Sequence, residues 1–328
     1  MDQKLNIPMM SFEPILKSVI WGGNKIAPFK GITTDQQNIG ESWEVSGVPG
    51  HESVVAEGPD KGKTLGELVK TYKGALVGEH VYERFGDTFP LLIKIIDAAG
   101  DLSLQVHPDD ELAKKRHNSL GKTEMWYIVD TDPGAVICAG LSEHITPDEY
   151  VKRVADNSLM DVIAHHNSKP GDVFFLPAGR VHSIGAGNML VEVQETSDVT
   201  YRIYDFGRLD KDGKPRELHV DLAKDAIDYT VYPDYRTQPS KIDENISMLV
   251  TCDHFTVGRI DINEFKKIFF DDLDSFFTST CIAGELKVTD DRGNTITLRQ
   301  GETILVPAMA SSITYEGNGS VVNAYINK

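Results

Sequence analysis

The sequence is poor in cysteine and has no long apolar run. Its 328 residues include three cysteines, Cys138, Cys252 and Cys281, which form neither a CxxC pair nor a disulfide framework. No stretch approaches the roughly 20 consecutive apolar residues that a membrane-spanning helix needs. The opening segment, MDQKLNIPMMSF, is too polar for a secretory leader. We therefore expect a reduced, cytoplasmic setting and no membrane partner.

Positive charge is also scarce. The chain has 33 Lys and Arg against 50 Asp and Glu, which gives a formal net charge of −17. A nucleic-acid partner requires a clustered basic surface, so we expect none. A small phosphorylated molecule is not excluded, because salt screens remote charges over about 8 Å and a few cations in a cleft then act locally.

What the sequence does contain is typical of a globular protein with many short strands. Hydrophobic residues make up 40% and charged residues 25% of a chain long enough for two domains. Its 28 glycines and 15 prolines are spread along the whole length and indicate frequent turns. Helical patterns interrupt the strands near 64–72, 108–117, 146–166 and 217–229. The third of these opens with a capping box at Thr146.

One spacing, Gly-x5-Pro, occurs twice. It begins at Gly171 in GDVFFLPAGRVH and at Gly301 in GETILVPAMASS. His182 closes the first copy, and Ser312 takes the corresponding place in the second. Chance alone can produce such a spacing twice, but both copies also share a glycine turn, an apolar strand and a proline in the same order. The simplest interpretation is two similar barrels in tandem.

This repeat predicts a mainly β fold that divides at the polar, proline-rich stretch 231–241. We expect a catalytic domain over residues 1–238, with short helical insertions, and a second barrel over residues 239–328. The second barrel contains a single histidine, His254, which is too few for an ordinary metal site. We therefore expect this barrel to bind no metal and to support the fold, with His254 outside the chemistry.

Four residues in the first domain have the types and positions of metal ligands. Gln105 and His107 are two apart on a predicted strand, so their side chains leave the same face. Glu124 begins a later strand, and His182 follows the turn of the repeat. Two imidazoles, one carboxylate and one amide oxygen suit a mixed N/O metal site with room for water or substrate. Each residue alone is equally typical of a polar strand end or loop, so the prediction depends on the four together.

Other polar residues allow more than one interpretation. His117, His165 and His166 end predicted helices, which favours a role as charges that complement the helix dipole. Lys94 lies within an apolar strand, where an unpaired ammonium is costly, so it either extends to solvent or serves a site. The segment 192–216 is dense in charged residues and is either a solvated hairpin or part of a site.

Several longer motifs point to a known family. They are WGG at 21–23, GESWEVS at 40–46, FPLLIKIIDA at 89–98 with LSLQVHPDDE at 102–111, GKTEMWYI at 121–128, and GRVHSIGAGNMLVEVQETSDVTYRIYDFGR at 179–208. With these motifs the chain resembles the type I mannose-6-phosphate isomerases in their short bacterial form, over essentially its whole length. The QVHPDD and SDVTYR blocks are the specific ones.

The resemblance implies two cupin-type β-barrels, or jelly rolls, and one bound divalent ion, Zn²⁺. The implied ligands are the four residues already named: Gln105, His107, Glu124 and His182. Gln105 stands where most cupins have a histidine, which is this family's own variant. The large helical insertion of the longer family forms is missing here.

The implied activity is an aldose–ketose isomerase that interconverts D-mannose 6-phosphate and D-fructose 6-phosphate through a metal-stabilised enediol. The resemblance implies catalytic roles for Arg202, Glu192 and Lys122, with Glu192 near the position of the proton-transferring base. Substrate binding, including the phosphate, is assigned to Trp21, Lys94 and Ser103. The partner is then a phosphorylated hexose, and we expect a monomer or weak homodimer.

Two alternatives use similar ligands. An iron-dependent cupin oxygenase has the same ligand types, but such sites usually use three histidines. A non-catalytic sugar-binding or regulatory cupin is the alternative function. It would not need Arg202, Glu192 and Lys122 gathered around the metal.

Overall fold

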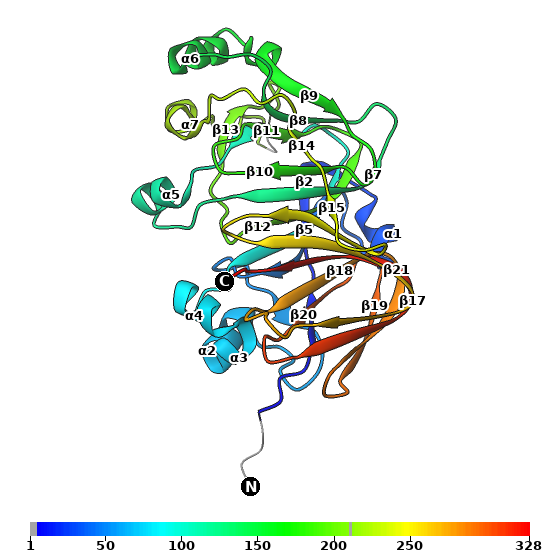
Figure 1. The fold of residues 1–328 in the computed structure, drawn as a ribbon. Coiled ribbons are helices and arrows are strands. Elements are labelled where there is room, and N and C mark those ends of the chain that lie inside the picture. Colours follow the sequence, from blue (N-terminus) through cyan, green and yellow to red (C-terminus); the bar gives the residue numbers. More distant parts are fainter. Residues whose placement is uncertain (1–4, 210–211) are drawn as a thin grey trace.

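The computed structural model describes residues 5–209 and 212–328 and is mainly β, as the sequence predicts (Figure 1). Strands in these residues form sheets of seven, five and nine strands, and the helices are short. None of the helices in the described ranges is long and apolar enough to cross a membrane. The three sheets are stacked, with the seven-stranded sheet in the middle.

The seven-stranded sheet has the order β14-β10-β7-β12-β5-β2-β3. Its strands are β2 (Ile15–Gly23), β3 (Ile39–Ser46), β5 (Leu91–Ala98), β7 (Glu124–Thr131), β10 (Val173–Leu176), β12 (Asn188–Glu195) and β14 (Arg236–Thr237). Every residue of β5 and β12 is buried, although β12 alternates apolar residues with polar ones such as Glu192 and Gln194. Both faces of this sheet are therefore covered.

The five-stranded sheet covers one of these faces. Its order is β13-β6-β11-β8-β9, with β6 (Leu104–Val106), β8 (Val136–Leu141), β9 (Ile163–Asn167), β11 (His182–Ile184) and β13 (Tyr201–Tyr204). Ile96 and Trp126 of the middle sheet share an apolar cluster with Ile137 and Ile184 of this one. Alternation along the middle strands directs the even-numbered residues, Ile96 and Trp126 among them, toward this sheet.

The other face of the middle sheet packs against the C-terminal part of the chain, residues 239–328, here called the C-terminal half. Ile95 and Tyr127 belong to a cluster that also contains Val257 and Leu305. The strands of the nine-stranded sheet are β1 (Met10–Glu13), β4 (Val54–Val55), β15 (Ser240–Lys241), β16 (Ile246–Thr251), β17 (Thr256–Phe269), β18 (Phe277–Asp290), β19 (Thr295–Arg299), β20 (Thr303–Val306) and β21 (Ser312–Tyr325). The start of the chain thus completes the C-terminal sheet. All three strand orders are open, so they do not by themselves establish two closed barrels.

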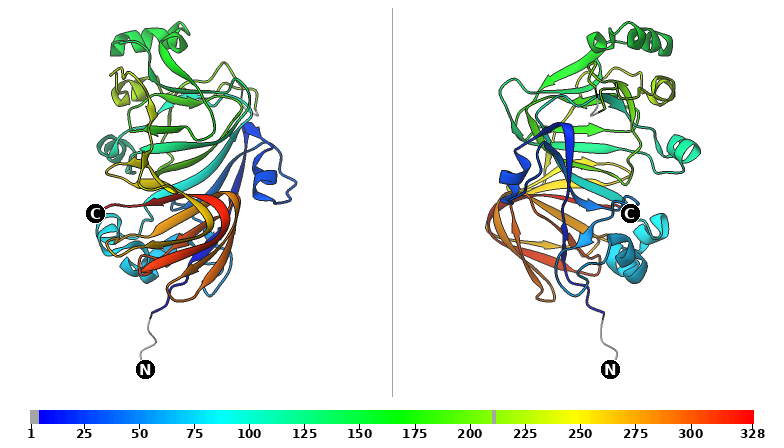
Figure 2. Two further views of the ribbon diagram at one scale, coloured as in Figure 1. Left: turned by 45° about the vertical axis from the view of Figure 1, so that its right-hand side comes forward. Right: turned by 180° about the vertical axis from the view of Figure 1, so that it is seen from behind.

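The helices are α1 (Ile26–Lys30), α2 (Leu65–Tyr72), α3 (Gly74–Val77), α4 (Glu79–Phe85), α5 (Asp110–His117), α6 (Pro147–Ala155) and α7 (Val220–Ala226), with a 3₁₀ turn at Leu159–Val162. Helices α2 to α7 lie along one side of the molecule, and α1 lies on the other (Figures 1 and 2). The backbone of α3 accepts hydrogen bonds from Phe276 and Ala308, so α2 to α4 are docked on the C-terminal half.

The predicted helix over 146–166 is wrong in its second half. It begins as expected, with a capping box between Thr146 and Glu149, but α6 ends at Ala155. His165 and His166 lie in β9, which pairs with β8. They therefore do not complement a helix dipole. Strand pairing and the burial of Ile163 outweigh the helical period that continues through this segment. The helix expected over 217–229 is shorter, Val220–Ala226.

The stretch 231–241 carries the chain from one half to the other. Its residues 236–237 form β14, which pairs with β10, and residues 240–241 form β15, which pairs with β16. Tyr235 is buried, and its hydroxyl donates to the Leu141 carbonyl at 2.8 Å. The connection is therefore hydrogen-bonded to the seven-stranded sheet through β14 and to the nine-stranded sheet through β15.

Candidate functional site

The predicted metal ligands converge between the five-stranded and seven-stranded sheets. In the five-stranded sheet, Gln105 on β6 lies opposite His182 on one side and Arg202 on the other. His107 directly follows β6. Glu124 is the first residue of β7 in the facing sheet. Strand order therefore brings together residues that are up to 97 positions apart, from Gln105 to Arg202 (202 − 105 = 97).

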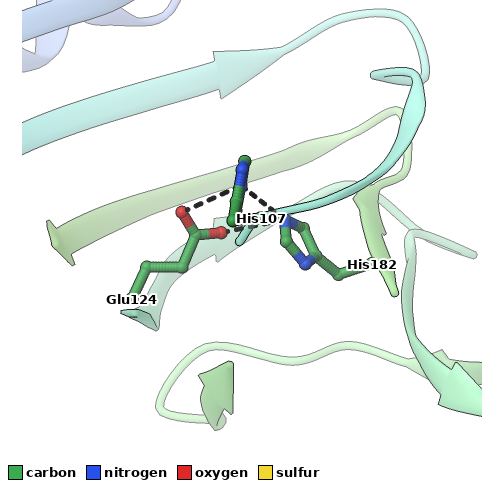
Figure 3. Close-up of side chains that lie close together, drawn as sticks. All are labelled: His107, Glu124 and His182. Carbon is green, nitrogen blue, oxygen red and sulfur yellow. Dashed lines mark hydrogen bonds and ion pairs between the residues drawn. The ribbon is translucent and has the colours of Figure 1, made fainter. Parts of the chain in front are cut away.

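Three of these residues form a tight, buried cluster (Figure 3). The Nε2 atoms of His107 and His182 lie 3.2 Å apart. Glu124 lies 3.0 Å from His182 Nε2 through Oε1 and 3.5 Å from His107 Nε2 through Oε2. The amide nitrogen of Gln105 lies 3.3 Å from His182 Nε2. Rotation of that amide brings its oxygen to the same place.

Hydrogen bonds set the tautomer of both histidines. His107 Nδ1 lies 2.9 Å from the Val199 carbonyl, and His182 Nδ1 lies 2.8 Å from the Arg180 carbonyl. A carbonyl can only accept, so each Nδ1 carries the proton and each Nε2 presents a lone pair to the cluster.

This donor set fits a divalent cation. Two imidazole lone pairs face each other, and Glu124 Oε1 has no hydrogen-bond partner in the described part of the chain. Tetrahedral zinc with Zn–N bonds of about 2.0–2.1 Å has its donor atoms about 3.3 Å apart. The observed separations of 3.0–3.5 Å match that geometry.

The protonation states of the cluster suit metal ligation. Lys122 Nζ lies 3.0 Å from His107 Nε2 and also contacts Glu124 Oε2. Burial opposes ionisation of Glu124, but the charge of Lys122 beside it opposes this effect, and the pKa of the carboxyl lies well below its usual range. Burial, followed by the charge of Lys122, lowers the pKa of His107 well below its usual value. Glu124 is therefore ionised and His107 neutral, as metal ligands must be.

A second polar group lies beside the cluster on the middle sheet. Glu192 is paired across the strands with both Lys94 and Trp126. Lys94 Nζ lies 2.8 Å from Glu192 Oε1, and Trp126 Nε1 donates to Glu192 Oε2 at 2.7 Å. Burial disfavours the charged form of Lys94, yet Glu192 and Glu41 outweigh it and raise its pKa. Lys94 therefore does not extend to solvent. It lies in the site.

The remaining predicted residues differ in their surroundings. Arg202 donates through Nη1 to the Glu217 carbonyl at 3.0 Å, whereas its buried Nε has no partner among the described residues. Ser103 is buried just before β6. Trp21 packs in the apolar cluster between the two sheets.

The segment 192–216 combines both interpretations that the sequence allows. Glu192 and Arg202 belong to strands next to the ligand cluster. Farther along, Asp205 forms ion pairs at 2.6 Å with both Arg208 and Arg216, as in a polar hairpin.

Sequence reasoning did not predict a second cation, Lys17, close to Lys94. Trp43 pairs with Lys94 across β3 and β5, and the Lys17 ammonium lies 3.5 Å from the centre of the Trp43 ring. Trp43 Nε1 donates to Glu41 at 2.5 Å. The alternation in GESWEVS places Glu41 and Trp43 on one face and could have revealed them. Nothing local to Lys17 marks it.

Comparison with known proteins adds independent findings. Residues 9–134 match the family model described as phosphomannose isomerase type I, catalytic domain. Residues 245–326 match the model described as mannose-6-phosphate isomerase, cupin domain. The chain is 39% identical over 252 residues to mannose-6-phosphate isomerase ManA of Bacillus subtilis, covering 76% of this chain and 78% of that protein.

Two further similarities span nearly the whole chain. Mannose-6-phosphate isomerase of Streptococcus mutans is 32% identical over 316 residues, which are 94% of this chain and 95% of that protein. The crystal structure of mannose 6-phosphate isomerase from Bacillus subtilis superposes with a TM-score of 0.88 at 32% identity, covering 98% of this chain and 100% of that one.

Proposed function

The chain belongs to the type I mannose-6-phosphate isomerases, and from this membership we propose that it interconverts D-mannose 6-phosphate and D-fructose 6-phosphate beside His107, Glu124 and His182. One observation supports this location most directly. Two imidazole lone pairs and a carboxylate oxygen without a partner among the described residues converge in a buried place. Such an arrangement suits the binding of a cation.

We propose that the cofactor is one Zn²⁺ ion held by Gln105, His107, Glu124 and His182. Glu124 would be its only anionic ligand, so a divalent ion there keeps a net charge of about +1 by simple counting of formal charges. When bound, such an ion supplies Lewis-acid stabilisation for the oxygens of the sugar.

The protein's own residues position the sugar and move the proton. Isomerisation removes a proton from one of the two carbons C1 and C2 and returns it to the other. We assign the base to Glu192, whose carboxylate is oriented by Lys94 and Trp126. Arg202 presents a planar guanidinium where negative charge develops on oxygen, and Lys122 donates a hydrogen bond to the sugar.

Both oxygens of Glu192 already accept hydrogen bonds, so one of them must lose its donor before Glu192 can accept a proton from the sugar. Lys94 is also assigned to the substrate, and a phosphate would give its ammonium a second anionic partner. A shift of Lys94 toward the phosphate would free Glu192 Oε1 to accept the proton. Ser103 and Trp21 complete the proposed substrate-binding set, and Lys17 adds a cation beside Trp43.

We further propose that both halves are cupin-type barrels, divided between residues 238 and 239. The repeat supports this view. Gly171 and Gly301 have positive φ angles of 90° and 80°, and each is the third residue of the turn before an apolar strand. Each strand ends in a proline turn, closed by Arg180 N–H donating to the Pro177 carbonyl at 3.1 Å and by Ala310 N–H donating to the Pro307 carbonyl at 2.9 Å. A cytoplasmic location and a monomeric or weakly dimeric state belong to the same proposal.

The test is a coupled assay that measures fructose 6-phosphate formed from mannose 6-phosphate. We expect activity in the zinc-loaded protein, loss on treatment with a chelator, and recovery when zinc is added back. Binding of the sugar phosphate without turnover, with zinc present, would favour a non-catalytic sugar-binding protein instead.

A further inference from the structure

The backbone that carries Lys122 and Glu124 is held by two carboxylates. Asp110 Oδ1 accepts the Gly121 N–H at 2.7 Å, and Glu195 Oε2 accepts the Thr123 N–H at 2.7 Å. The Thr123 carbonyl in turn accepts the Glu195 N–H at 3.1 Å. These bonds fix residues 121 and 123, on either side of Lys122 and directly before Glu124.

Each carboxylate has a second oxygen, and both of these face one histidine of the C-terminal half. His254 Nδ1 lies 2.9 Å from Glu195 Oε1 and 3.9 Å from Asp110 Oδ2. Glu195 is almost fully buried, whereas Asp110 is half-exposed. His254 is thus placed to neutralise the two groups that hold the 121–123 backbone.

The turn that carries His254 is itself anchored. It connects β16 and β17, and Arg84 on α4 donates to the Asp253 carbonyl at 2.9 Å. Within the turn, Cys252 N–H donates to the Phe255 carbonyl at 3.0 Å. His254 is therefore presented by a defined backbone.

We propose that His254 is a positioning residue for the isomerase site, acting through Glu195 and Asp110 on Lys122 and Glu124. Sequence reasoning placed His254 outside the chemistry, and this proposal replaces that view. It also gives the C-terminal half a part in the reaction. The inference rests on the proposed function, because it concerns the zinc ligand Glu124 and the substrate-facing Lys122.

The same three residues could ligate a second metal ion, but the geometry favours the ionic contact. One oxygen of each carboxylate is already committed to a backbone N–H. The 2.9 Å separation of Nδ1 and Oε1 is that of a hydrogen bond. The hydrogen bond to Glu195 also raises the pKa of His254, which favours the protonated imidazole.

The experiment measures zinc affinity of the full chain by competition with a chromophoric chelator, without substrate, and kcat and KM with substrate. We expect His254→Ala to weaken zinc binding and to lower kcat by about tenfold each, the lower end of the range for groups that orient a metal ligand. KM should change little. His254→Asn retains a donor near the Nδ1 position and should restore most of the zinc affinity.

The matched control is His80, which also joins the two halves. Its Nδ1 lies 3.2 Å from Asp274, its Nε2 lies 2.9 Å from the Asn327 carbonyl, and its side chain is 23% exposed against 25% for His254. His80→Ala should lower the melting temperature as His254→Ala does, but leave zinc affinity and kcat within about twofold.

Three results would overturn the proposal. They are equal losses of zinc affinity in the His80 and His254 variants, unchanged zinc affinity in His254→Ala, and a second equivalent of bound zinc that disappears in His254→Ala. The zinc measurement needs no turnover, so it remains informative if wild-type protein shows no isomerase activity. Absence of isomerase activity in the wild-type protein would contradict the proposed function, but it would not contradict this inference.

Discussion

Single hydrogen bonds decide what the central histidines can do. Because His107 and His182 each use Nδ1 to reach a backbone carbonyl, only Nε2 remains for a ligand. We expect His107→Ala or His182→Ala to lose most of the bound zinc, since each removes one of the four proposed ligands. Elemental analysis of purified protein checks this, and full zinc content together with full activity in both variants would refute the ligand assignment.

Arg202 offers a second prediction at this scale. Arg202→Lys keeps a positive charge but loses the planar fork, so zinc content should remain normal. We expect kcat to fall about 10²-fold, the scale for removing one stabiliser of a developing oxyanion. Steady-state kinetics separates two roles for this residue. A rise in KM alone would make Arg202 a phosphate-binding residue.

Spacing along the sequence predicted those residues of the candidate site whose motif is local. Gln105 and His107 share a strand face, and Glu124 and His182 stand at strand starts. The environment of Lys94 could not be predicted, because its partners Glu192 and Trp43 lie on neighbouring strands. The contact between His254 and Glu195 was also hidden, since nothing near either residue in the sequence points to the other.

At the scale of helices and strands, starts were easier to predict than ends. Thr64 and Thr146 both act as N-caps with capping boxes, as local side-chain chemistry dictates. The end of α6 could not be predicted in the same way. Asn157 has a positive φ of 59°, and the chain then joins β8 as β9, which depends on contacts outside the local sequence.

The cap of α6 gives a prediction about stability alone. Thr146 accepts the Glu149 N–H at 3.2 Å, on a helix far in sequence from the ligand cluster. We expect Thr146→Ala to lower the free energy of unfolding by about 1 kcal/mol. Chemical denaturation measures this loss. Thr146→Ser is the control that keeps the cap, and kcat should be unchanged in both variants.

For the molecule as a whole, the sequence predicted a mainly β chain that divides into two domains near residue 238. It did not predict how the halves are joined. The middle sheet lies between the other two because Ile96 and Ile95 face opposite ways along one strand. Alternation fixes these two faces, but which sheet covers each face depends on the full topology.

The contact between the halves predicts a pH dependence of stability. Glu195 is the main cause of the raised pKa of His254, Asp110 adds to it, and Arg84 opposes it. A raised pKa means that the contribution is fully present below the unfolded value of about 6.5 and is lost as pH rises through the folded value. Wild type should therefore exceed His254→Asn in unfolding free energy by more at about pH 6 than at about pH 9. Denaturant titrations at the two pH values test the sign, and a difference that grows with pH would contradict it.

The pairing of β1 with β20 has a consequence for synthesis of the chain on the ribosome. Met10 lies opposite Leu305, a separation of 295 residues (305 − 10 = 295). At 5–20 residues per second, about 15–60 s pass between synthesis of these two positions. During that time the first strand has no neighbour on its β20 side, and its exposed edge can pair with other chains. The pairing of β1 with β20 can therefore form only after nearly the whole chain has been synthesised.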